Sequence, residues 1–279
     1  MKITEKIHCL KIPFQIKISS EIILNRFAYV YIALGDKLYM IDTGVSSGEN
    51  LILDYIKEQG RSVDEIDKIF LTHSHPDHIG ALKLIKQKTK ALVHAHKNKI
   101  SCIENTELQF SERPVPGFKY LVSGSAKVDI LVKNGDIIKL ENGQTVKVIY
   151  TPGHSDDSVS YFFKEDKILI SGDLVLLPGD IPIYDNYREL KNSLNMIKQI
   201  DFNVLLSSWD EPRYREEALK IIDKSIEYLD RIDAVVKNVS LNSNDDDIML
   251  FCKNIVEKLR LTPAAVNPLC ARSFMSHID

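Results

Sequence analysis

The sequence has few cysteines and no long apolar run. Its cysteines lie far apart and form no C-x-x-C pair, so we expect reduced thiols in a cytoplasmic protein: Cys9, Cys102, Cys252 and Cys270. No apolar run is long enough to span a bilayer. Residues 1–17 alternate apolar and charged side chains, which is not the pattern of a signal peptide.

An excess of charge is also missing, because the formal net charge is −3. Lysines are scattered, whereas a nonspecific duplex binder usually carries a concentrated basic face. We therefore expect a small-molecule substrate and no nucleic-acid or membrane partner; a homodimer is possible. Low-complexity segments and short repeats are absent as well.

What is present is the composition of an ordinary globular chain. Of its 279 residues, 44% are hydrophobic and 27% are charged. Such a chain can bury a core without disulfides or a structural metal. A metal site in this sequence would therefore be functional.

Strand-like and helix-like stretches alternate through the first three quarters of the chain, which predicts an α/β layered domain. Residues 27–34 and 37–42 are rich in β-branched and aromatic residues around a Gly-Asp pair, which predicts a hairpin. Residues 48–60 have apolar side chains at helical spacing and end at a glycine. Residues 111–125 look irregular. Further strands are expected at 67–72, 91–96, 137–140, 145–151, 158–163, 167–171 and 203–208, and further helices at 80–87 and 187–199.

The last quarter of the chain is helical in pattern. Residues 215–238 and 245–261 predict two amphipathic helices, the second with acidic residues at the positive end of its dipole, and 262–278 predict a third. We expect a catalytic domain over residues 1–212 and a helical C-terminal extension over 213–279.

The strongest signal for chemistry is the sequence HSHPDHIG at residues 73–80. In an extended loop His73 and His75 point to the same side, so they can bind one ion. Asp77 and His78 come where the chain turns into the next helix, so they can face a second ion. Imidazole and carboxylate ligands suit zinc, and also iron or manganese. The alternative is a polar loop with chance histidines.

Two later segments fit the same site. His154 directly follows a Pro-Gly turn after a strand, and Asp173 follows an apolar strand and a glycine. Each places one potential ligand at a strand end, where a sheet can bring distant side chains together. Either segment alone could be an ordinary turn.

In this order, HSHPDH, PGHS and SGD resemble the motifs of the metallo-β-lactamase superfamily, over roughly residues 20 to 212. The resemblance implies a four-layer αββα sandwich with its metals at one edge of the sheets. It also implies that Asp42, in MIDTG, supports the metal ligands and does not bind the metal itself. The implied ligands are His73, His75 and His154 for a first ion, Asp77 and His78 for a second, and Asp173 bridging both.

One expected ligand is missing from this pattern. The superfamily normally supplies a last histidine after the final strand, where this chain has Trp209. Asp210, next to it, is our candidate replacement, although it could instead cap the following helix. His277 is another candidate, or else a surface histidine.

The remaining histidines and aromatics carry less weight. His94 and His96 alternate like ligands, but they read as the end of a buried strand, and His8 as an ordinary strand residue. Tyr184, Tyr187 and Phe118 could line a pocket or simply pack; the sequence does not distinguish the two.

These features predict a glyoxalase II-like hydrolase with one or two ions, zinc foremost. A metal-bound hydroxide would attack a small ester, thioester or lactone-like substrate, with Asp77 as catalytic proton carrier. One alternative is a mononuclear iron enzyme resembling persulfide dioxygenases, with His73, His154 and Asp173 as ligands. Another is an RNase Z-like phosphodiesterase, which the lack of a basic arm disfavours.

Overall fold

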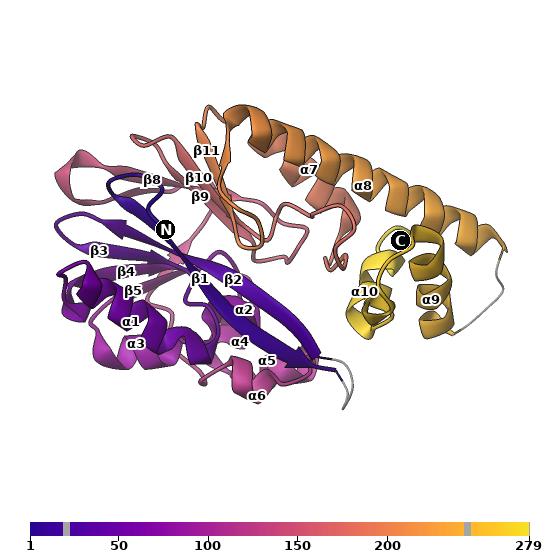
Figure 1. The fold of residues 1–279 in the computed structure, drawn as a ribbon, viewed down its shortest axis with the longest axis horizontal. Coiled ribbons are helices and arrows are strands. Elements are labelled where there is room, and N and C mark those ends of the chain that lie inside the picture. Colours follow the sequence, from indigo (N-terminus) through magenta and orange to yellow (C-terminus); the bar gives the residue numbers. More distant parts are fainter. Residues whose placement is uncertain (19–22, 243–246, 279) are drawn as a thin grey trace. The chain divides into compact units, whose positions relative to one another are not determined.

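Two six-stranded mixed sheets, flanked by helices, make up the α/β part of the chain (Figure 1). The computed structural model describes residues 1–18, 23–242 and 247–278. The chain divides into two compact units, residues 1–149 with 159–165 and residues 150–158 with 166–279, and each is described by itself. The predicted boundary after residue 212 stays a prediction.

The first sheet lies wholly in the first unit and has the order β1-β2-β3-β4-β5-β6. β2 and β3 are antiparallel, with Tyr31 opposite Ile41 and Leu34 opposite Leu38, so the predicted hairpin is confirmed. From β3 onward the pairing is parallel. The strands are β1 (Ile7–Lys17), β2 (Ile23–Leu34), β3 (Leu38–Ile41), β4 (Ile66–Phe70), β5 (Leu92–His96) and β6 (Ile130–Val132).

The second sheet has the order β12-β11-β10-β9-β8-β7. Within the second unit, β10 and β11 are parallel and β12 returns antiparallel to β11. The strands are β7 (Ile137–Lys139), β8 (Thr145–Tyr150), β9 (Val159–Phe163), β10 (Ile168–Gly172), β11 (Val204–Ser207) and β12 (Arg213–Tyr214).

Strands of the two sheets pack face to face within the first unit. The Phe70 and Tyr161 rings are 5.2 Å apart, and the Tyr161 hydroxyl donates to the Leu71 carbonyl at 2.9 Å. Helices α1 and α3 lie beside β3 to β5 in Figure 1, with their apolar faces buried. The helices of this unit are α1 (Glu49–Glu58), α2 (Pro76–Ile79), α3 (Leu82–Lys88), α4 (Ile100–Glu104), α5 (Thr106–Glu112) and α6 (Phe118–Leu121).

The irregular structure predicted for residues 111–125 is wrong in part. Helix α5 runs to Glu112, and α6 covers Phe118 to Leu121. Phe118 and Leu121 are buried, and Gly117 precedes them at a φ of 74°. A four-residue helix is too short to produce a recognisable helical period in the sequence.

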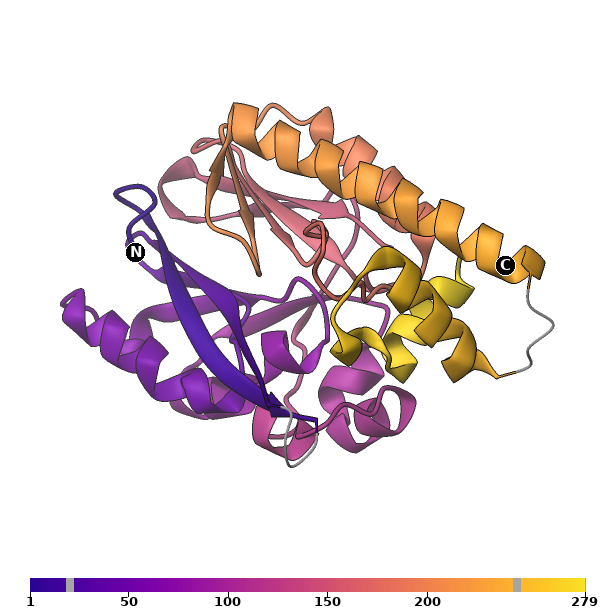
Figure 2. The same ribbon diagram turned by 45° about the vertical axis from the view of Figure 1, so that its right-hand side comes forward.

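The second unit carries the predicted helical C-terminal region. Figure 2 shows the long helix α8 in orange and the later helices in yellow, and α8 contacts both α7 and α9. Asp247 caps α9 by accepting from the amides of Met249 and Leu250, whereas Asp245 and Asp246 lie outside the described residues. The helices are α7 (Tyr187–Lys198), α8 (Arg215–Asn242), α9 (Ile248–Leu259) and α10 (Pro268–Met275).

The interior of this helical region is apolar and includes Ile232, Phe251, Ile255 and Phe274. Among the residues the structure describes, no helix combines the length and apolarity needed to cross a membrane. All four cysteines are buried and free of disulfides.

Candidate metal centre

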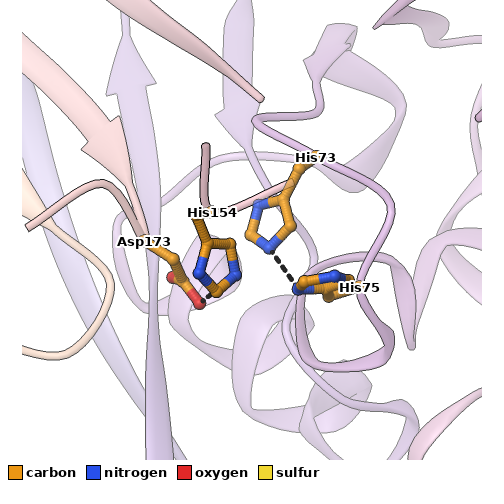
Figure 3. A group of neighbouring side chains, drawn as sticks. All are labelled: His73, His75, His154 and Asp173. Carbon is orange, nitrogen blue, oxygen red and sulfur yellow. Dashed lines mark hydrogen bonds and ion pairs between the residues drawn. The ribbon is translucent and has the colours of Figure 1, made fainter. Parts of the chain in front are cut away.

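The loop after β4 holds the first set of potential ligands. His73, His75 and His78 are buried, with 2%, 5% and 0% of their surface exposed. His73 Nε2 lies 3.0 Å from His75 Nδ1, the contact drawn in Figure 3. Two nitrogens bound to one zinc at about 2.1 Å would lie roughly 3 to 3.5 Å apart. The two rings therefore already have the spacing of ligands that share an ion.

Asp42 holds this loop in place through hydrogen bonds. One carboxylate oxygen accepts the Thr72 amide at 2.8 Å, and the other accepts the Thr72 hydroxyl at 2.7 Å and His78 Nδ1 at 2.8 Å. Since a carboxylate only accepts, His78 carries its proton on Nδ1 and keeps the Nε2 lone pair. Asp42 has a φ of 59°, a left-handed backbone conformation that residues other than glycine seldom adopt.

Thr72 extends this arrangement to the first histidine. Its hydroxyl hydrogen is used on Asp42, so the oxygen accepts from His73 Nδ1, 3.1 Å away. His73 consequently keeps its Nε2 lone pair, the atom that faces His75. A carboxylate or hydroxyl bonded to the far nitrogen of a histidine is the usual support behind a metal ligand.

Asp77 and His78 both belong to the short helix α2. Pro76 starts this helix at its first position, where the missing amide hydrogen does no harm. Asp77 Oδ2 lies 3.7 Å from His78 Nε2, and the Asp77 side chain is partly exposed. The predicted pair is thus neighbouring in space as well as in sequence.

In the second unit, His154 and Asp173 form another pair. His154 Nε2 lies 3.4 Å from Asp173 Oδ2, as Figure 3 shows. His154 Nδ1 donates to the Ile183 carbonyl at 2.9 Å, which leaves the Nε2 lone pair toward Asp173. This pair also has the separation of two ligands on one ion.

Gly153 gives the His154 loop its shape. Its φ is 127°, and a Cβ there would lie 2.1 Å from the Leu190 amide nitrogen. Its carbonyl accepts the amides of Asp185 and Asn186, at the start of α7. The Pro-Gly turn therefore packs directly against helix α7. This packing fixes the backbone position from which the His154 side chain extends.

Asp210 and Trp209 lie in the segment after β11, as the sequence indicated. Asp210 forms a two-point ion pair with Arg213, at 2.8 Å for each contact, and also accepts the Glu211 amide. Asp210 as a replacement for the missing histidine stays a prediction, and in the structure its carboxylate is engaged by the Arg213 guanidinium. The structure gives it the role of closing the turn before β12.

His277 is neither exposed nor available as a ligand, so both earlier interpretations are wrong. It is 5% exposed, Nε2 is 2.6 Å from the Tyr184 hydroxyl, and Nδ1 is 3.1 Å from Asp233. Tyr187 stacks on the ring at 4.2 Å. Tyr184 and Tyr187 therefore pack and bond within the C-terminal region.

His94 and His96 lie on the buried strand β5, as expected. Burial lowers the pKa of His94 to about 4, so the ring is neutral near pH 7. It packs against Phe70, with ring centres 5.0 Å apart. His8 is a strand residue bonded to the Tyr55 hydroxyl at 2.7 Å.

Sequence reasoning missed two groups that orient the potential ligands. Thr72 directly precedes His73, and a hydroxyl beside a ligand motif is a usable signal. The Ile183 carbonyl gives no signal, because any residue supplies one.

Comparison with known proteins agrees with this fold and these motifs. The family model of the metallo-beta-lactamase superfamily matches residues 24–229, and the chain belongs to that superfamily. It is a metallo-β-lactamase-fold hydrolase by these relationships.

Individual relatives match more than half of the chain. A probable metallo-hydrolase of Bacillus subtilis is 31% identical over 54% of this chain and 68% of its own. A metallo-beta-lactamase fold-containing protein of Sulfurisphaera tokodaii is 32% identical over 69% of this chain and 77% of its own. The crystal structure of a metallo-beta-lactamase family protein from Thermus thermophilus has a TM-score of 0.76 at 14% identity. It covers 99% of this chain and 93% of that one, so the shared fold includes the C-terminal helices.

Proposed function

We propose that the chain hydrolyses a small ester, thioester or lactone-like substrate with a divalent metal, zinc foremost. His73, His75, His154 and Asp173 would hold the first ion. Asp77, His78 and Asp173 form the candidate group for a second. The observation that carries the proposal is that each pair of potential ligands has the spacing of groups on a shared ion.

The donor set fits zinc on chemical grounds. Neutral imidazoles and a carboxylate are zinc ligands, and manganese or iron can use the same set. Hydrogen bonds to Nδ1 of His73, His78 and His154 hold these rings in the tautomer with a lone pair on Nε2. A divalent ion bound there lowers the pKa of a water molecule to about 7 and polarises a carbonyl oxygen.

The protein's own groups would do the rest. Asp42, Thr72 and the Ile183 carbonyl hold the histidine rings in their orientations through hydrogen bonds. The partly exposed Asp77 carboxylate would take the proton of the attacking water and pass it to the leaving group.

The substrate class follows from the relatives by analogy. A hydroxyacylglutathione hydrolase of Bartonella henselae is 29% identical over 50% of this chain and 47% of its own. Its name specifies a glutathione thioester. A small thioester or ester is therefore the first substrate class to test, and the superfamily fold alone does not choose within it.

Two further expectations accompany this proposal. Four buried cysteines outside disulfides support a cytoplasmic protein. A small-molecule substrate without nucleic acid, and a possible homodimer, remain predictions.

The test is hydrolysis by metal-free and reconstituted protein. Apoprotein, then protein with added Zn²⁺ or Mn²⁺, would be assayed with acyl thioesters, aryl esters, lactones and an aryl phosphodiester. We expect thioester or ester turnover that requires metal and is lost in His154→Ala but kept in the control His8→Gln. Equal turnover with and without metal, or in His154→Ala, would contradict the proposal, and turnover of the phosphodiester alone would favour a nuclease.

A further inference from the structure

A buried series of hydrogen bonds links the C-terminal end of the protein to the loop before α7. The Tyr184 hydroxyl donates to His277 Nε2 at 2.6 Å, and His277 Nδ1 donates to Asp233 of α8 at 3.1 Å. Tyr184 is 1% and His277 5% exposed. Both side chains are thus shielded from solvent, so an effect of this cluster on the candidate site has to pass through the residues that it contacts.

The protonation of this chain is fixed by its surroundings. Burial lowers the pKa of His277, its largest influence, so the ring is neutral. Burial raises the pKa of Asp233, but hydrogen bonds from Lys237 and His277 outweigh it and bring that pKa below its usual value. Burial raises the pKa of Tyr184 well above its usual value, so the hydroxyl keeps its proton. The two hydrogen bonds therefore point the same way: the phenol donates to the imidazole, and the imidazole donates to the carboxylate.

One peptide group connects this cluster to a potential metal ligand. The Tyr184 amide donates to Ser273 Oγ of α10 at 2.8 Å, and the Ile183 carbonyl accepts from His154 Nδ1 at 2.9 Å. These two groups belong to the same peptide unit, which is planar, so its amide hydrogen and its carbonyl point in opposite, fixed directions. Ser273 on one side thus sets the direction of the acceptor for His154 on the other.

The same segment is held at further points. Ser273 Oγ also lies 2.8 Å from the Tyr184 carbonyl, and the Tyr187 amide donates to Ser276 Oγ at 3.1 Å. Of these serine contacts, the one between Ser273 and the Tyr184 amide involves the Ile183–Tyr184 peptide, whose carbonyl accepts from His154. Ser276 holds the backbone three residues later.

We propose that α10 positions His154 for metal binding, with Ser273 as the positioning residue acting through the Ile183–Tyr184 peptide. This inference rests on the proposed function, in which His154 is a metal ligand. It assigns the C-terminal helices a part in metal affinity that is independent of substrate.

The first experiment measures zinc affinity of the full chain by competition with a chromophoric chelator. We expect Ser273→Ala to weaken binding about 10- to 100-fold, as loss of support behind a metal ligand generally does. The matched control is Ser276→Ala, which removes a hydroxyl from the residue that follows the same helix and should leave affinity unchanged. Equal affinity in Ser273→Ala and wild type, or an equal loss in both variants, would overturn the proposal.

A second readout needs no metal. In ¹⁵N-histidine-labelled apoprotein, wild-type His154 should be a single Nδ1–H tautomer, with its signal assigned from His154→Ala. Ser273→Ala should give a mixture of tautomers, Ser276→Ala should not, and Ser273→Thr, which keeps the hydroxyl, should restore the single form. An unchanged His154 signal in Ser273→Ala contradicts the positioning role.

The two proposals fail in different ways. If His154→Ala binds zinc as tightly as wild type, the metal assignment of His154 is wrong. If His154→Ala loses zinc and Ser273→Ala does not, the metal site stands and the role of α10 is overturned.

Discussion

Replacement of Gly153 by alanine tests how the Pro-Gly turn fixes His154. The new Cβ would lie 2.1 Å from the Leu190 amide nitrogen, 2.3 Å from its Cα and 2.6 Å from its Cβ. Real Cβ contacts are essentially never under 3.0 Å, so either the loop or the start of α7 must move by nearly an ångström. Backbone strain at the φ of 127° adds about 1–3 kcal/mol.

The control is Gly117→Ala. Gly117 also has a positive φ, 74°, but a Cβ there would meet nothing within 4 Å. This variant should lose only about 1–2 kcal/mol, from the backbone term. We expect Gly153→Ala to lose about 1–3 kcal/mol more, which is the common cost of overpacking.

The assay is urea unfolding of the metal-free proteins followed by circular dichroism, with zinc affinity measured on whichever variants fold. Gly153→Ala should show both the larger stability loss and weaker zinc binding. Equal unfolding free energies for the two variants would refute the close-packing argument, because only one of them meets a neighbouring backbone.

Three further predictions follow from the first unit. Asp42→Asn should weaken zinc binding about 10- to 100-fold by competition titration, whereas Asp129→Asn, which removes a carboxylate bonded to Lys86 and Val93, should not; equal losses would contradict this role. Asp77→Asn should lower kcat about 100-fold or more, and unchanged kcat would exclude it as proton carrier. The pKa of His94 is about 4 in the folded protein and 6.5 as its ordinary value. As pH falls from 6.5 toward 4, the unfolded chain therefore binds a proton that the folded protein does not, and the folded protein loses stability. His94→Phe apoprotein should therefore lose about 3 kcal/mol less than wild type over this pH range in urea titrations, and parallel pH profiles would disprove it.

Most of the fold could be predicted because its elements are long enough to have a period. The hairpin around residues 35–36 and helices such as α1 and α8 show clear alternation or helical spacing. Short elements such as α6 do not, because their positions are set by tertiary packing of Phe118 and Leu121.

The candidate site could likewise be predicted only in part. The potential ligands stand out because their residue types coincide at short spacing, as in HSHPDH. The surroundings of Asp210 and His277 could not be predicted because each depends on a partner. Arg213 is only three residues from Asp210, but nothing in the sequence says that they bond. Tyr184 and His277 are 93 residues apart, so only the fold brings them together.

The most direct test of a metal-dependent hydrolase is the metal content of protein purified without chelator or affinity tag. Elemental mass spectrometry would be run on wild type and His154→Ala in parallel. We predict one to two ions per wild-type chain, mainly zinc or manganese, and a clear loss in the variant. No metal in wild type and none taken up on reconstitution would contradict the account, as would one iron per chain accompanied by oxygen consumption.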